Sequence, residues 1–196
     1  MNASDLALEL RPALQRVLNS YQSAKRENFT GHPLANTIRN EIPALVIGVL
    51  GQDGLGLRIK GSSGQGRWAE SPWIAIMDPI AAKGPQWGYY VVYLFAGSLQ
   101  RLVLSLSQGV STEVPEMLAP NAALIRSKVP EFRETFSDDP IMLDAKSPNV
   151  PAAYYEKGHA FGRTYEATLP PEFELAEDLR KMVRLYRLLA KRKHGL

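Results

Sequence analysis

The chain of 196 residues has the length of one domain, and its hydrophobic content of 45% is enough for a buried core. It has no cysteine, which excludes disulfides, thiolate nucleophiles and cysteine-based metal sites. The net charge is only +3 but is unevenly spread: residues 58–112 carry five basic and two acidic side chains, 113–179 carry six and thirteen, and 180–196 carry seven basic ones. Only local basic segments therefore support binding to nucleic acid.

The first residues show neither the basic nor the apolar segment of a secretory signal, and no apolar run is long enough to span a membrane. We therefore expect a cytoplasmic protein without a membrane partner. The three histidines, His32, His159 and His194, stand alone in the sequence. Since none has a second histidine at a ligand spacing, we expect no metal and no cofactor.

Leucines at helical spacing near the start of the chain predict an amphipathic helix over residues 1–25, with Ser4 as its N-cap and a kink or restart at Pro12. The apolar run at residues 44–50 is interpreted as a short extended segment, and residues 57–60 as a second one. Glycines separate these two segments, as is typical of turns.

Three further segments, at residues 73–77, 89–95 and 101–107, are rich in aromatic, β-branched and leucine side chains. Such segments, joined by short connections, predict strands of an antiparallel meander or a curled sheet. The predicted sheet core extends over residues 44–110.

Residues 173–191 carry an apolar stripe at helical spacing, with acidic side chains at the start and basic ones at the end, as the helix dipole favours. They predict a closing helix. We therefore predict a single α+β domain over residues 1–196, in which a mixed, largely antiparallel curled sheet is flanked by N-terminal and C-terminal helices.

Residues 60–67, Lys-Gly-Ser-Ser-Gly-Gln-Gly-Arg, are a polar, basic-flanked loop between two predicted strands. Its hydroxyls and backbone N–H groups suit contact with phosphate, but it has neither the Lys-Ser/Thr of a Walker loop nor the helix of a dinucleotide fingerprint. Two interpretations stay open, a plain hairpin connection or a contact to an anion or nucleic acid. The second assigns DNA contacts to Arg58, Lys60, Ser62, Ser63, Gln65 and Arg67.

Seven aromatic side chains lie within 28 residues, from Trp68 to Phe95. Most are expected in the core, because large rings dominate the cores of small sheet proteins. A subset could instead line a pocket that stacks on an extruded base.

An enzyme is the first alternative to a DNA-binding function. Asp144 and Lys146 match half of a metal-dependent nuclease site, in which carboxylates bind a divalent ion and the lysine helps to activate water. The possible second carboxylates of the nuclease site are Glu131, Glu134, Asp138 and Asp139. A solvated loop is the plain alternative.

A protein-interaction module that uses the aromatic face of the sheet is the second rival interpretation.

Three blocks of sequence together resemble a known family. The first, residues 57–78, contains the Gly-x-Gly-x-Trp and Pro-Trp elements; the second comprises the strand-like residues 88–95 and 102–109; the third extends from Tyr155 to Tyr186. They resemble the N-terminal DNA-binding domain of McrB, the specificity subunit of a modification-dependent, type IV restriction system.

The resemblance implies a non-catalytic domain that binds double-stranded DNA at a modified cytosine, of the 5-methylcytosine type, and flips that base into an aromatic and aliphatic pocket. It also implies phage defence as the setting, and an AAA+ GTPase or nuclease module in the same chain or complex. Gln65 replaces a tyrosine at the loop tip of the best-known relative, so it offers hydrogen bonds in place of stacking. The pocket residues carried over are Trp73, Leu94 and either Tyr154 or Tyr155.

Overall fold

The structure is a computed structural model that describes residues 10–109 and 115–194. In this part of the chain, five strands form one sheet whose order in space follows their order in the sequence, and every neighbouring pair is antiparallel. The predicted α+β class is confirmed. The strands are β1 (Arg58–Ser62), β2 (Trp73–Met77), β3 (Tyr89–Phe95), β4 (Arg101–Gln108) and β5 (Phe161–Glu166).

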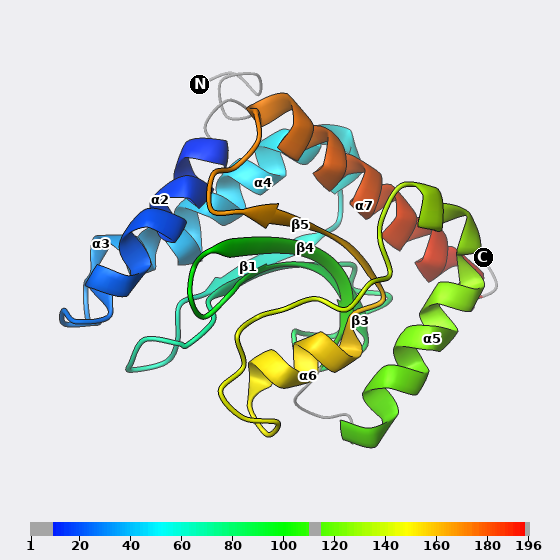
Figure 1. Cartoon of the computed structure of the whole chain (residues 1–196). Coiled ribbons are helices and arrows are strands. Elements are labelled where there is room, and N and C mark those ends of the chain that lie inside the picture. The colour runs from blue at the N-terminus through cyan, green and yellow to red at the C-terminus, as the bar shows by residue number, and fades with distance from the viewer. Residues whose placement is uncertain (1–9, 110–114, 195–196) are drawn as a thin grey trace.

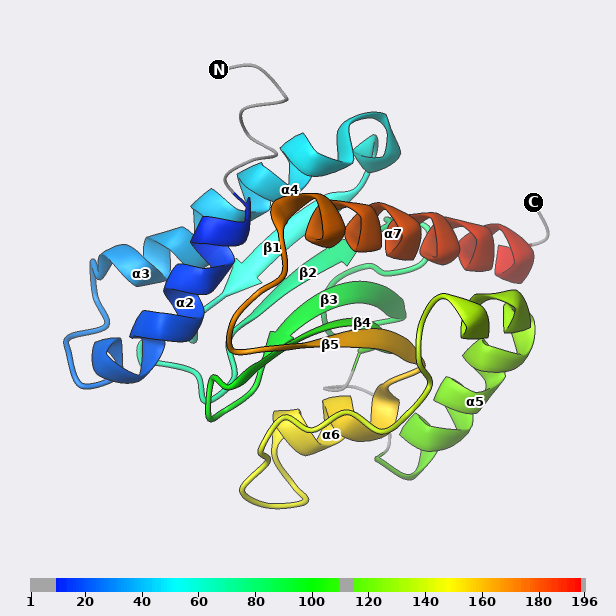
Figure 2. The ribbon, with the colours of Figure 1, turned by 45° about the horizontal axis from the view of Figure 1, so that its top comes forward.

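Helices lie on both sides of this sheet, as Figures 1 and 2 show: α2, α4 and α7 cover one face, and α6 covers part of the other with α5 beside it. The predicted flanking helices are thus confirmed. The helices and helical turns are α2 (Leu10–Ala24), α3 (Pro33–Asn36), η1 (Thr37–Glu41), α4 (Ile42–Leu50), η2 (Gly51–Gly54), η3 (Pro115–Met117), α5 (Leu118–Lys128), η4 (Pro130–Glu134), α6 (Pro151–Gly158) and α7 (Glu172–His194).

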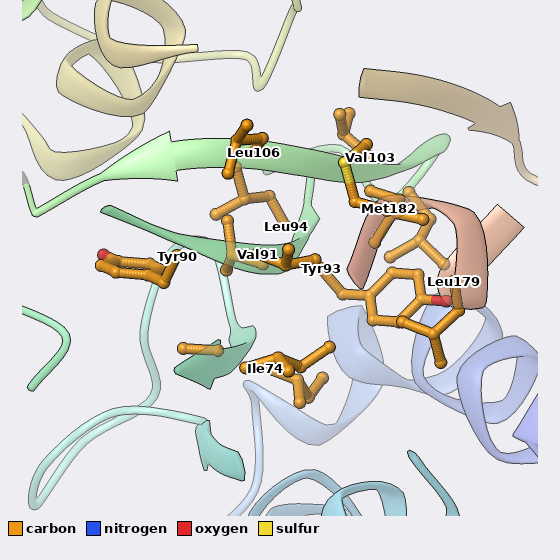
Figure 3. Close-up of a cluster of buried hydrophobic side chains, with 14 of the residues drawn as sticks. Ile74, Tyr90, Val91, Tyr93, Leu94, Val103, Leu106, Leu179 and Met182 are labelled. Atoms are coloured by element: carbon orange, nitrogen blue, oxygen red, sulfur yellow. The ribbon is translucent and has the colours of Figure 1, made fainter. Parts of the chain in front are cut away.

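The strand register divides the sheet side chains between two faces. Cross-strand partners share a face, so Ile74, Tyr93 and Leu104 point to the same side. Figure 3 shows the Tyr93 ring extending toward Leu179 of α7, which identifies this side as the one covered by α2, α4 and α7. Trp73, one residue before Ile74, therefore lies on the opposite face, which α6 covers only in part.

The prediction of an extended segment at residues 44–50 is wrong, because these residues belong to helix α4. A continuous apolar run does not by itself distinguish a buried strand from a buried helix. Pro43 lies in the first turn of α4, a position at which proline is common. The buried side chains Ile42, Leu45, Val46 and Val49 recur at helical spacing.

The two ends of the described chain are joined by polar contacts. The backbone N–H of Arg11 donates to the Glu172 carboxylate at 2.6 Å, and its guanidinium donates to the carbonyl oxygen of Pro170 at 2.8 Å. The Gln15 side chain donates to the carbonyl of Ala167 and accepts from the N–H of Leu169. These contacts fix α2 beside the start of α7. Pro12 lies in the first turn of described α2, whereas Ser4 lies outside the described residues.

Candidate nucleic-acid interface

A cleft opens on the sheet face that α6 leaves partly uncovered. It has a volume of about 550 Å³ and lies over β1 and β2, between the loop that joins them, the segment before β3 and the start of α6. None of the described residues that line it is acidic. The lining residues are Arg39, Lys60, Gly61, Ser62, Gly64, Gln65, Trp73, Pro85, Gln86, Pro151 and Tyr155.

Two aromatic side chains form apolar walls of this cleft. Trp73 is the first residue of β2; it is partly buried and lies opposite Ser62 of β1 in the register. Tyr155 comes from α6, and its hydroxyl lies 3.1 Å from the hydroxyl of Tyr90 in β3. Burial raises the pKa of Tyr155, despite the hydrogen bond with Tyr90. The phenol therefore stays neutral at physiological pH and presents an uncharged wall.

The two other residues assigned to the base pocket do not line the cleft. Leu94 lies opposite Trp73 in β3, on the same face of the sheet, and is completely buried in the core beside the tryptophan. Tyr154 is partly buried and packs against the hydrophobic core. Of the two tyrosines that the resemblance offered, the structure brings Tyr155 to the cleft.

The loop between β1 and β2 is shaped by two glycines with positive φ angles. A Cβ atom on Gly64, at φ 118°, would lie 2.0 Å from the carbonyl oxygen of Arg67, so the chain can pass so close to itself only at a glycine. Gly66 has φ 66°. The N–H of Ala69 donates to the Ser63 carbonyl at 2.8 Å and closes the loop at its base.

Trp68 anchors the far end of this loop to α2 and to the segment that follows it. Its indole N–H donates to the carbonyl of Glu27 at 3.2 Å. The rings of Tyr21, Phe29 and His32 contact it edge to face, at centroid distances of 5.2, 5.1 and 4.9 Å. The Gly-x-Gly-x-Trp element therefore has a structural basis, since its glycines make the bend and its tryptophan fixes the loop.

The loop residues assigned to DNA contacts take different positions. Lys60, Ser62 and Gln65 line the cleft. Arg67 is exposed on the loop outside the cleft lining, whereas the Ser63 side chain is completely buried and is not presented to a ligand in this conformation.

Two further cations, Arg58 and Arg39, lie near β1. Arg58 lies at the other end of the strand, with its guanidinium 3.4 Å from the carbonyl of Ala82. Arg39 lines the cleft but was not predicted, because in the sequence it is only one cation in a polar stretch.

Asp144 and Lys146 have separate partners in the structure. The Asp144 carboxylate accepts from Arg101 at 2.6 Å and from the hydroxyl and N–H of Ser98, whereas Lys146 forms an ion pair with Glu70 at 2.8 Å. Burial opposes the shift, but the bonds from Ser98 and the charge of Arg101 lower the pKa of Asp144 below its ordinary value. Within residues 10–109 and 115–194, no group of three or more His, Asp or Glu side chains is placed to hold a metal ion.

The structure is thus an α+β domain with a cleft on the uncovered part of its sheet. A family model described as "MrcB-like, N-terminal domain" matches residues 16–191. The chain therefore belongs to the family of McrB-like N-terminal domains, and this membership indicates a DNA-binding specificity domain. No curated protein sequence matched the chain. Among its described helices, none combines the length and the apolar character needed to cross a membrane.

Proposed function

We propose that this chain is the DNA-recognition domain of a modification-dependent restriction system, and that its cleft holds a modified cytosine flipped out of the duplex. The observation that carries the proposal is the cleft itself, which brings Lys60, Ser62, Gln65, Trp73 and Tyr155 together from three elements and one loop. Its volume of about 550 Å³ is within the range of small-molecule sites, roughly 300–1,000 Å³.

The lining residues supply the interactions that an extruded base needs. Trp73 is only partly buried and offers an apolar surface for stacking, the buried Tyr155 contributes a small part of the lining, and Gln65 and Ser62 offer donors and acceptors for the base edge. Stacking and edge hydrogen bonds offset the few kcal/mol that extrusion costs. A buried methyl group contributes only about 1 kcal/mol, so strong discrimination also requires that a misplaced polar atom be penalised.

Trp73→Ala should weaken binding to modified duplex DNA by about 5-fold to 150-fold, because stacking of one base on an aromatic ring contributes about 1–3 kcal/mol. Fluorescence anisotropy titrations with duplexes that carry unmodified, 5-methyl-, 5-hydroxymethyl- or N4-methylcytosine measure this effect. Phe173→Ala is the matched control, since Phe173 is 67% exposed on α7, a helix of the other sheet face. Equal binding of the wild-type protein to all four duplexes at every salt concentration would contradict the base-pocket proposal.

Lys60→Gln should weaken binding to all duplexes alike and reduce the slope of log K against log salt concentration by about 1, the contribution of one phosphate contact. Lys181→Gln is the control, because Lys181 pairs with Glu177 within α7 at 2.6 Å. A loss of preference for the modified base at an unchanged salt slope would show that Lys60 contacts the base and not a phosphate.

In this proposal the domain is a reader in the cytoplasm, and cleavage in phage defence is carried out by an AAA+ GTPase or nuclease module in the same chain or complex. The rival functions predict different results. DNA cleavage by this chain in Mg²⁺ that Asp144→Ala abolishes would contradict a purely binding role. A folded chain without DNA affinity at low salt would favour a protein-interaction module.

A further inference from the structure

The loop between β1 and β2 separates the cleft from a second hollow. This hollow has a volume of about 620 Å³ and lies between the loop, α3 and η1. Gln65 lines the cleft and Gly66 lines the second hollow, so the loop tip forms the boundary between the two. Arg39 of η1 lines both. Its side chain is therefore placed to determine where the boundary lies.

The backbone around Arg39 has an uncommon geometry. The N–H of Ile42 donates to the carbonyl of Thr37, five residues earlier, which makes η1 a π-helical turn between α3 and α4. Pro43 has no N–H to donate to the Arg39 carbonyl, and an interrupted ladder of this kind favours such a turn. Single π-helical turns of this type are frequently found at functional sites.

The turn also lies unusually close to the sheet. A Cβ atom on Gly61 of β1 would lie 1.8 Å from the carbonyl oxygen of Ile38 and 3.2 Å from the Cα of Arg39. The backbone of η1 therefore contacts β1 at the one position of the strand that has no side chain. This close approach places Arg39 directly beside the start of the loop.

From this position Arg39 contacts one end of the loop directly and the other through a single ring. Its Nη2 donates to the carbonyl of Gly64 at 2.6 Å. Its guanidinium lies over the Phe29 ring at 4.8 Å from the centroid, and Phe29 contacts Trp68 edge to face. Gly64 and Trp68 flank the loop tip, so one guanidinium connects both of its ends to η1.

We propose that Arg39 is a positioning residue that holds the loop tip, and with it Gln65, over the cleft, and so determines selectivity for the extruded base. This inference rests on the proposed function of the cleft. The planar guanidinium stacks on Phe29 while it donates to Gly64, whereas a lysine ammonium lacks the planar face and the forked donors. Arg39→Lys therefore retains the charge but not the positioning.

The first test uses the free protein and requires no DNA. Arg67 is exposed in the loop and is a trypsin site, so the rate of cleavage after it reports how often the loop leaves its position. Both Arg39→Gln and Arg39→Lys should raise this rate about fivefold, as measured by mass spectrometry of the fragments. Arg16→Gln is the matched control: Arg16 pairs with Glu41 of the same turn, at 3.1 Å. A wild-type rate in both Arg39 variants would overturn the proposal.

The second test measures extrusion by the fluorescence of 2-aminopurine placed at the target base, together with the salt dependence of binding. Both Arg39 variants should lose about fivefold in preference for modified over unmodified DNA and should give a weaker extrusion signal. Arg39→Lys should keep the wild-type salt slope. Wild-type selectivity and extrusion in Arg39→Lys, with a reduced salt slope in Arg39→Gln, would show a phosphate contact and overturn the positioning role.

The two tests separate failure of this inference from failure of the proposed function. If the wild-type protein shows no preference for modified DNA, the base-pocket function fails, while faster cleavage in the Arg39 variants would still support positioning of the loop. If the wild-type protein is selective and the Arg39 variants behave like it in both tests, the function stands and the inference fails.

Discussion

Gly61→Ala should lower the melting temperature of the protein by about 10 °C. The added methyl group would lie 1.8 Å from the carbonyl oxygen of Ile38, and a backbone carbonyl cannot move aside as a flexible side chain can. Strand β1 and turn η1 must then separate, at a cost of about 3 kcal/mol in the free energy of unfolding. In a domain of this size each kcal/mol changes the melting temperature by about 2–4 °C.

Gly84→Ala is the matched control for this experiment, because a Cβ atom at Gly84 has no neighbour within 4 Å. Thermal unfolding followed by circular dichroism compares the two variants. The same substitution at Gly61 should also speed cleavage after Arg67, since it displaces the turn that carries Arg39. A Gly61→Ala protein as stable as the wild type would show that the close contact between η1 and β1 is not a constraint on the fold.

The free energy of unfolding should fall by about 2 kcal/mol between pH 7 and pH 5, mainly because of His159. Burial lowers the pKa of His159 to about 4, and the nearby positive charge of Arg126 adds to the shift. The unfolded chain binds this proton near the ordinary pKa of about 6.5. Neutral His159 therefore stabilises the folded state above about pH 6.5, and this contribution to the free energy of unfolding is lost as the pH falls from about 6.5 toward 4.

The environment of His159 accounts for its neutral form. Its Nδ1 lies 2.8 Å from the hydroxyl of Ser105 in β4, and only 4% of the residue is exposed. In the variant His159→Gln, urea titrations at pH 7 and pH 5 should show most of the pH-dependent loss removed, even if the variant is less stable at both. An unchanged pH dependence in His159→Gln would rule out this residue as its source.

Much of the sheet could be predicted because its strands have simple patterns. Residues 73–77, 89–95 and 101–107 are runs of aromatic, β-branched and leucine side chains, and each lies in a strand. Strand β5 was not predicted, since its burial depends on contacts made far along the chain. A Cβ atom on Gly162 would lie 2.6 Å from the Leu104 carbonyl, a constraint that no local pattern shows.

The candidate site could be predicted where its residues are neighbours in sequence. Lys60, Ser62, Gln65 and Trp73 belong to one hairpin, and a polar loop before an aromatic strand marked them as a group; their contact with DNA stays a prediction. Tyr155 reaches the cleft from α6, and only the resemblance to a family pointed to it. Arg39 could not be found, because its position depends on a π-helical turn that no residue pattern identifies.

The polar contacts of Arg11 and Gln15 with residues 167–172 have a consequence for synthesis of the chain. Strand order follows sequence order, so β1 to β4 can pair as the ribosome releases them. The Arg11 contact with Glu172 joins residues 161 positions apart. At roughly 5–20 residues per second, α2 emerges on the order of ten seconds before these partners. The fold of the domain is therefore completed only when α7 has been made, and until then the nascent chain is accessible to chaperones and proteases.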